Sequence, residues 1–224
     1  MARQLRLSLK RPAPFTRETF IQGASNSDAV TALDAWPCWP GGALVLVGAD
    51  GVGKSHLAQA WATVAKAVTL DREHPDVGAA AGRAVLLEDV DQGVGAEALF
   101  HLINLAAHDG ASLLLTARKA PATWPAELPD LRSRLNALMV AEIAPPDDDV
   151  LRGVLKKFFR ERNIRPNDDV YPYLLRRMER SIPGAPEIVR RLAETDDGQM
   201  RPISRVLARE ILEADIENLD LFEG

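Results

Sequence analysis

The sequence has little cysteine, few aromatic residues and no long hydrophobic run. Cys38 is the single cysteine among 224 residues, so no internal disulfide can form. Together with the lack of a signal-peptide pattern, this favours a reducing, cytoplasmic setting. We expect Cys38, which lies between two Trp-Pro pairs, to be buried as a small hydrophobe. No apolar run approaches the ~18 residues of a membrane span, so we expect no membrane association.

An excess of basic charge is also missing. Lysine and arginine number 27 against 32 acidic residues, which gives a net charge of −5. A chain of this kind does not indicate general binding to nucleic acid, although a local basic patch stays open. Hydrophobic residues make up 46% of the chain, enough for a substantial core. The length allows one large domain, or a medium and a small one.

Apolar strands alternate with amphipathic helices through the first part of the chain. Continuous apolar runs ending in polar residues or glycine are typical of buried parallel strands. Alternation of such strands with helices predicts an α/β domain, a five-stranded parallel sheet with helices on both faces. The strands are expected at residues 43–48, 67–70, 84–90, 111–117 and 137–143, and the helices at 27–35, 54–66 and 96–108.

The pattern changes at Ala144–Asp149, which reads APPDDD. Two prolines stop the last strand, and the aspartates suit the cap of a helix. The rest of the chain has only helical periodicity, with apolar faces around residues 150–159, 170–178, 188–192 and 206–211. We therefore predict an extended tail at 1–14, an α/β domain at 15–145 and a small all-helical domain at 146–224.

The stretch Gly48–Ser55, GADGVGKS, matches the phosphate-loop pattern G-x-x-x-x-G-K-[ST] completely. A predicted strand precedes it and a predicted helix follows, which is the context the motif requires. Its backbone N–H groups and the helix N-terminus would bind phosphate, Lys54 would contact the β- and γ-phosphates, and Ser55 would hold Mg²⁺. We expect ATP or ADP here, bound by Gly48, Asp50, Gly51, Val52, Gly53, Lys54, Ser55 and His56.

Polar residues at two other strand ends complete the expected site. Glu88 and Asp89 end the third predicted strand, where one would hold Mg²⁺ and the other would orient water. Many such ATPases place Asp first, so the Glu-Asp order predicts weak hydrolysis. Thr116 ends the fourth strand and is expected to reach the γ-phosphate or the water; a simple capping role in a loop is the alternative.

Two longer stretches, Glu18–Ala62 and Asp130–Phe158, resemble the nucleotide-binding domain of the bacterial replication initiator DnaA. The second holds the narrower signature, LRSRL followed by EIAPPDDDVL. The likeness runs from about Phe15 to Leu212. It implies the AAA+ fold, a five-stranded P-loop domain followed by a helical lid.

The resemblance also implies residue roles. Arg134, in the S-R element, corresponds to an arginine finger that acts in trans on the nucleotide of a neighbouring subunit. Adenine would contact Ile21 and Gln22. The lid position that carries an arginine in the family falls near Pro183 here, so Arg180 is the expected substitute and a diphosphate state is favoured.

Two further departures from DnaA narrow the likeness. The segment Asp71–Arg83 is short where DnaA has extra helices, and no DNA-reading domain follows the lid before Gly224. These features resemble the Hda-like family of regulators that inactivate DnaA. Such proteins carry an N-terminal peptide of pattern Gln-Leu-x-Leu-x-Leu that docks on the sliding clamp (β subunit) of the replicative polymerase. The matching residues are Gln4, Leu5, Leu7 and Leu9.

The resemblance therefore implies a negative regulator of replication initiation, with the clamp and DnaA as partners. It would have weak or no ATPase activity of its own and would activate hydrolysis in DnaA. A homodimer is possible, and no sequence-specific DNA binding is expected. The alternative function is a self-sufficient ATPase of the helicase-loader kind that acts on single-stranded DNA.

Overall fold

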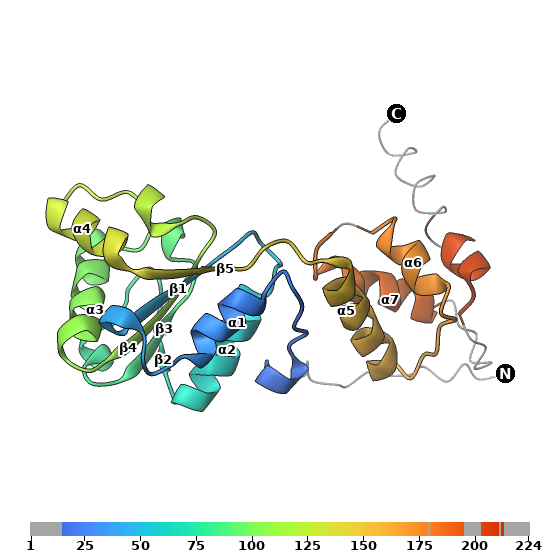
Figure 1. Cartoon of the computed structure of the whole chain (residues 1–224), viewed down its shortest axis with the longest axis horizontal. Coiled ribbons are helices and arrows are strands. Elements are labelled where there is room, and N and C mark those ends of the chain that lie inside the picture. The colour runs from blue at the N-terminus through green and yellow to red at the C-terminus, as the bar shows by residue number, and fades with distance from the viewer. Residues whose placement is uncertain (1–14, 179, 195–202, 211, 213–224) are drawn as a thin grey trace.

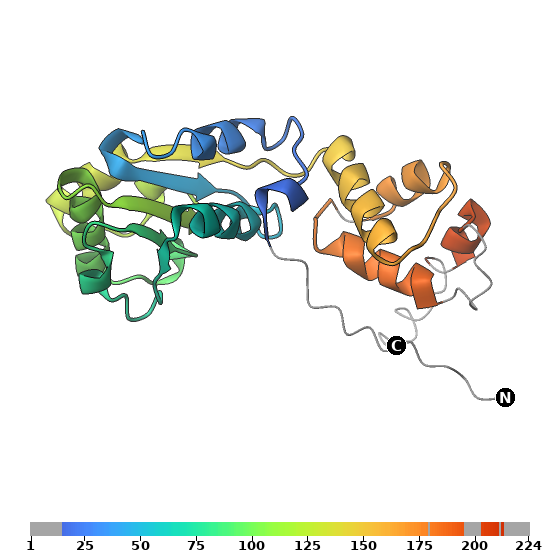
Figure 2. The ribbon, with the colours of Figure 1, turned by 90° about the horizontal axis from the view of Figure 1, so that it is seen from below.

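The computed structural model describes residues 15–178, 180–194, 203–210 and 212. The expected clamp-binding residues Gln4, Leu5, Leu7 and Leu9 lie outside the described residues. Figures 1 and 2 show two lobes, and the chain passes from the first to the second at residues 143–147. We call the lobe with the sheet the base and the helical lobe the lid.

The base contains one five-stranded sheet in the order β2-β3-β4-β1-β5, and every pairing is parallel. This confirms the predicted α/β class. Because β1 is flanked by β4 and β5, the ends of these three strands meet at one edge; Leu46 of β1 is in register with Thr116 of β4. The strands are β1 (Ala43–Val47), β2 (Val68–Thr69), β3 (Ala84–Leu87), β4 (Ser112–Ala117) and β5 (Met139–Glu142).

Helices cover both faces of the sheet, and the pleat of β1 shows how. Successive residues of a strand point to opposite faces. Leu44 and Leu46 pack in the core that includes α1 (Ser27–Asp34) and α2 (Lys54–Ala65). Val45 and Val47 pack in the other core, with α3 (Ala96–His108) and α4 (Pro129–Ala137). Short 3₁₀ turns lie at Arg17–Thr19, Pro40–Gly42, Val77–Ala80, Val90–Gln92 and Pro121–Thr123.

The described part of the lid is built from helices, with one isolated β-bridge between Pro166 and Ile203, and this agrees with the predicted helical lid. It contains α5 (Asp148–Glu161), α6 (Val170–Leu175), α7 (Gly184–Glu194) and a helical stretch at 205–210. These helices enclose a third core of their own, centred on Leu151, Phe159 and Tyr173. Asp147 caps α5, since its side chain accepts a hydrogen bond from the backbone N–H of Val150 at 2.8 Å.

Three local expectations were wrong. The third strand ends at Leu87, because Asp89 adopts left-handed backbone angles (φ 53°) and a 3₁₀ turn follows. The fifth strand begins at Met139, because α4, which the pattern did not predict, extends to Ala137. Cys38 is exposed, because the neighbouring Trp39 takes the buried place and its indole N–H donates to the carbonyl of Ala32.

The described helices contain none that is both long and apolar enough to span a bilayer.

Candidate functional site

The phosphate loop directly follows β1 and ends in α2, as the motif requires. Gly53 is the N-cap of α2 with a φ of +109°, a conformation that favours glycine. Val52 is 4% exposed and packs in the core beneath the loop, so its side chain anchors the turn from below. Of the predicted contributors, Gly48, Gly51, Val52 and Gly53 therefore supply backbone and anchorage rather than polar side chains.

Lys54 is already turned into the loop. Its side chain is 6% exposed, and its ammonium donates to the carbonyl oxygens of Gly48 at 2.8 Å and Ala49 at 2.9 Å. Lysine has three donors, so one is left for an anion. Ser55, the next residue, is exposed at the start of α2, where its hydroxyl is open to a bound cation. Both residues thus lie at the junction of the loop and α2, and their roles toward phosphate and Mg²⁺ stay predictions.

Glu88 and Asp89 lie at the carboxyl end of β3, two strands from the loop. Gln59 of α2 donates to Oε2 of Glu88 at 2.8 Å, while Oε1 is buried and has no hydrogen-bond partner within the described structure. A buried carboxylate oxygen normally has a partner. Because Oε1 lacks such a partner, it is chemically suited to the predicted role of a ligand to Mg²⁺ or to its water.

Thr116 is fully buried at the end of β4, the strand between β3 and β1. Its hydroxyl oxygen accepts the backbone N–H of Asp89 at 2.9 Å, so the threonine fixes the left-handed turn that follows β3. The strand placement that we expected for Thr116 is present. Its observed contact is to Asp89, which makes it a positioning residue for the acidic pair.

The lid contacts the phosphate loop through uncharged residues. The backbone N–H of Ile182 donates to the carbonyl of Gly51 at 3.3 Å. Pro183 packs so closely on Gly51 that a Cβ built there would lie 2.6 Å from its Cδ. Pro183, at the position where the family carries an arginine, therefore contacts the phosphate loop but brings no charge to it. Arg180 pairs instead with Asp148 of α5 at 2.8 Å, and both side chains are exposed.

The segment ahead of α1 connects base and lid. Phe20 packs in the base core, whereas the next residue, Ile21, packs against the lid core. The Cγ2 methyl of Ile21 lies 2.6 Å from a Cβ built on Gly153 of α5, a close fit that only glycine permits. Gln22 is exposed, and its side-chain oxygen accepts from Arg17 at 3.0 Å. The two residues predicted to contact adenine therefore differ: Ile21 faces the lid and Gln22 faces solvent.

His56, also predicted at the nucleotide, holds this same segment on α2. Its Nε2 lies 3.0 Å from the carbonyl of Thr16 and 3.2 Å from the hydroxyl of Thr19, and its ring packs against Phe15 and Phe20. Burial lowers the pKa of His56 from its usual value; the contact with the carbonyl of Thr16 partly opposes this, and the charge of Lys157 adds to the lowering. In this structure His56 serves the packing of the N-terminal segment.

Sequence reasoning missed three residues at the site: Gln59, Asp91 and Arg118. Oδ2 of Asp91 accepts the backbone N–H groups of Arg118 and Lys119 at 3.0 and 3.1 Å, which joins the loops after β3 and β4. The side chain of Arg118 pairs with Asp50 of the phosphate loop at 2.8 Å. Only the sheet order reveals these contacts, since the partners lie far apart in sequence.

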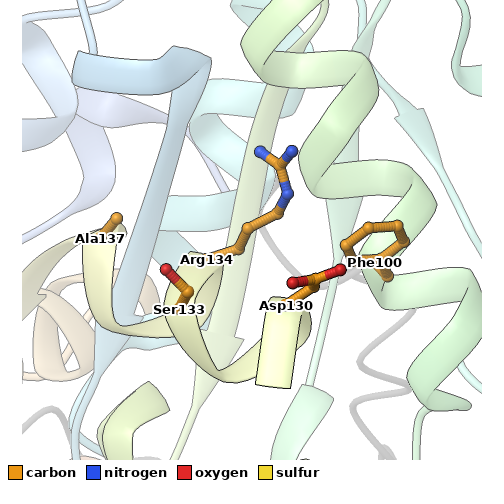
Figure 3. Close-up of a pocket in the computed structure, with 5 residues that line it drawn as sticks. All are labelled: Phe100, Asp130, Ser133, Arg134 and Ala137. Atoms are coloured by element: carbon orange, nitrogen blue, oxygen red, sulfur yellow. The ribbon is translucent and has the colours of Figure 1, made fainter. Parts of the chain in front are cut away.

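The predicted finger, Arg134, lies on α4. Figure 1 shows α4 at the end of the base that is far from the lid. The guanidinium stands over the ring of Phe100 at 5.5 Å, beside a hollow of about 380 Å³ lined by Phe100, Asp130, Ser133, Arg134 and Ala137 (Figure 3). Within the described structure it makes no hydrogen bond or ion pair. Arg132 is different, since its guanidinium donates to the carbonyls of Ala122 and Trp124 at 2.9 and 2.7 Å.

The base has a parallel sheet in the order β2-β3-β4-β1-β5, with a phosphate loop after β1 and an acidic pair directly after β3. Together with the helical lid, these features define a P-loop protein of the AAA+ class. Searches with protein-family models found no match. The chain is related by sequence to the chromosomal replication initiator DnaA over most of its length, and its fold is that of DnaA domain III.

The sequence likeness is low but extended. DnaA of Bacteroides thetaiotaomicron is 24% identical over 196 aligned residues, which cover 74% of this chain and 42% of that protein. DnaA of Flavobacterium psychrophilum is 22% identical, covering 97% of this chain and 52% of its own length. The chain thus spans about half the length of these relatives.

Solved structures show the same fold. Domain III of DnaA from Thermotoga maritima superposes with a TM-score of 0.72 at 18% identity, over 91% of this chain and 97% of that one. A DnaA structure with AMPPCP and single-stranded DNA bound gives 0.66 at 21% identity, over 83% and 66%. The Holliday junction branch-migration motor RuvB of T. maritima gives 0.67 at 16% identity, over 90% and 72%.

Proposed function

We propose that this chain is an Hda-like negative regulator of replication initiation. It binds ADP or ATP with Mg²⁺ in the Gly48–Ser55 loop, docks on the polymerase sliding clamp through its N-terminal peptide and activates ATP hydrolysis by DnaA. The activating group is Arg134. The proposal is supported by the sequence similarity to DnaA. One solved structure of DnaA contains bound AMPPCP.

The observation that carries the proposal is that the guanidinium of Arg134 lies at the surface without a charged partner in the described structure. It has no carbonyl partner there either, and it stands at a surface hollow. α4 ends directly before the amino end of β5, whereas the phosphate loop follows the carboxyl end of β1. Arg134 is therefore displaced from the nucleotide site of its own chain and suited to the nucleotide of another. An always-charged, planar guanidinium is well matched to the charge that develops on transferring phosphate.

The nucleotide of this chain itself is proposed to be mainly structural. Among its described residues, the lid offers Ile182 and Pro183 to the phosphate loop and no cation at that contact. The acidic pair begins with Glu88, one methylene longer than aspartate. Both features favour a bound diphosphate and slow intrinsic turnover, so the nucleotide orders base and lid for contact with DnaA.

The clamp-binding part of the proposal rests on Gln4, Leu5, Leu7 and Leu9 in the sequence. An extended peptide of this kind offers its backbone and alternate side chains to the partner. The described chain begins where Phe15 packs on His56 of α2, so the peptide would leave the body of the protein beside the phosphate-loop helix.

The main test is the rate of ATP hydrolysis by DnaA in the presence of clamp loaded on DNA. We expect Arg134→Ala to lower the stimulation by at least about a hundredfold, since such fingers contribute on the order of 10³–10⁵ in rate. The matched control is Arg83→Ala, an exposed arginine before β3 in the other half of the sheet, which should keep full stimulation. Full stimulation by Arg134→Ala refutes the finger.

Clamp docking has its own test. Gln4→Ala should weaken binding to the purified clamp in a pull-down, as should removal of residues 1–11. Unchanged binding by both variants rules out the peptide.

The competing function, a self-sufficient ATPase acting on single-stranded DNA, predicts a different result in a turnover assay. The chain alone would then hydrolyse ATP rapidly, and single-stranded DNA would raise the rate.

A further inference from the structure

Asp50 places a negative charge inside the phosphate loop itself. Its Oδ1 lies 2.8 Å from Nε of Arg118 and 4.0 Å from Nζ of Lys54. One carboxylate oxygen is thus flanked by the motif lysine and by an arginine from the loop after β4. No other carboxylate of the described chain forms an ion pair with Lys54 or Arg118.

Of these two cations, Lys54 is the one that the motif assigns to the phosphates, and Arg118 reaches the same carboxylate oxygen from the neighbouring loop. A phosphate-loop lysine contacts the β- and γ-phosphates. A carboxylate beside it repels added negative charge and competes for the same donors. A triphosphate brings one more phosphate group to this place than a diphosphate does. In its described part the lid adds no cation there, because it meets the loop at Gly51 through Ile182 and Pro183.

We infer that Asp50 determines the nucleotide preference of this site. Held by Arg118, its carboxylate occupies the cationic positions that the third phosphate would use, and so selects a diphosphate over a triphosphate. The inference rests on the nucleotide binding in the proposed function and extends it: the preference for ADP is set within the loop, by a residue pair, rather than by the lid alone.

The pair has little to do with folding. The side chains of Asp50 and Arg118 are 65% and 49% exposed, and exposed ion pairs contribute only about 0–1 kcal/mol to stability. The backbone of Arg118 is fixed separately, by the hydrogen bond from its N–H to Asp91. Substitutions of the two side chains should therefore leave the fold intact and report on the ligand.

The test is calorimetric titration of the full chain with ADP and with AMPPCP, each with Mg²⁺. We expect Asp50→Asn to strengthen AMPPCP binding relative to ADP by about tenfold, equal to about 1.4 kcal/mol. Arg118→Gln, which releases the carboxylate and removes a cation, should weaken AMPPCP more than ADP. The double variant should bind AMPPCP more tightly than Arg118→Gln alone. Lys119→Gln, an exposed neighbour with the same charge, is the control and should keep the ratio.

The outcomes separate this inference from the proposed function. Binding of both nucleotides with an unchanged ratio in Asp50→Asn overturns the inference alone. Binding of neither nucleotide by the unmodified chain overturns both. A double variant no better than Arg118→Gln also overturns it, since the arginine would then act directly on the phosphate and not through Asp50.

Discussion

Thr116 illustrates how one buried hydroxyl organises the acidic end of β3. It is fully buried, and it accepts the N–H of Asp89, whose left-handed backbone needs a fixed partner. Thr116→Val keeps the shape and removes the acceptor, so the Asp89 N–H loses its partner. We expect a loss of about 1–3 kcal/mol in the free energy of unfolding, measured by urea denaturation.

Thr123→Val is the matched control for that prediction. Its hydroxyl donates to the carbonyl of Ala120 in an exposed turn, where water replaces the bond. We expect a change within about 0.5 kcal/mol. Equal losses in the two variants would mean that the hydroxyl of Thr116 has no special role.

A motif in the sequence gives the type and the place of a residue, while its role stays a prediction. Lys54 and Ser55 lie at the start of α2 and Glu88 directly follows β3, and their roles toward phosphate and Mg²⁺ stay predictions. Residues whose partners come from distant strands were not predictable. The pairing of Asp50 with Arg118, far along the chain, depends on β1 and β4 being neighbours, and a single sequence contains no signal of that contact.

At the scale of elements, the packing of α3 against α4 orients Arg134. The Phe100 ring of α3 lies 5.5 Å from the guanidinium and supports it from one side. Phe100→Leu removes the cation–π contact, worth about 0.5–1 kcal/mol at an exposed site. We expect a loss of roughly threefold in stimulation of DnaA hydrolysis, with ADP affinity unchanged because α3 lies away from the phosphate loop.

Phe100→Tyr keeps a ring beneath the guanidinium and should restore stimulation. Equal losses in the leucine and tyrosine variants would indicate a general packing defect rather than orientation of Arg134.

The attachment of the N-terminal segment to α2 should depend on pH through His56. Burial lowers its pKa from 6.5, so the folded state binds this proton less readily than the unfolded state. The stabilising contribution is therefore complete above pH 6.5 and is lost as the pH falls below that value. Urea unfolding at a series of pH values, from about 7.5 down to about 5.5, should show decreasing stability.

Replacement tests the assignment to this histidine. His56→Gln should flatten the dependence between those pH values, whereas His108→Gln, on the exposed end of α3, should leave it in place. An unaltered slope in His56→Gln would assign the dependence to other groups.

The hydrophobic period of the sequence predicted whether a segment is a helix or a strand, but it did not predict the residues at which the elements end. All five strands and α3 were predicted, α3 with its observed bounds. α4 was missed because its sequence, PDLRSRLNA, buries only Leu131 and Leu135 and has a weak apolar stripe. β3 ends early because Asp89 adopts left-handed backbone angles, and the pattern of apolar residues in a strand does not indicate such a turn.

At the scale of the whole molecule, the position of the lid on the base depends on Phe20 and Ile21. These neighbouring residues pack in different cores, Phe20 in that of the base and Ile21 against that of the lid. Lys157 of α5 adds a bond to the carbonyl of Thr19 at 2.9 Å, and the backbone N–H of Ser25 donates to Asp147 at 3.0 Å. The lid is thus held by the segment that precedes α1 as well as by its own connection to β5. No sequence pattern indicated that the N-terminal segment ahead of α1 has this role.

A substitution of Gly153 tests whether the contact with Ile21 fixes the position of the lid. An alanine inside a helix ordinarily stabilises by about 1 kcal/mol relative to glycine. Here its Cβ would lie 2.6 Å from Cγ2 of Ile21, and a branched side chain between two cores has little room to move. We expect Gly153→Ala to lower stability, to raise the radius of gyration in small-angle scattering and to weaken ADP binding together, because the lid is displaced from the base.

Gly95→Ala, where the added methyl meets open space, should change none of the three. Stabilisation by Gly153→Ala would mean that the lid adjusts freely, and that the contact with Ile21 does not fix its position.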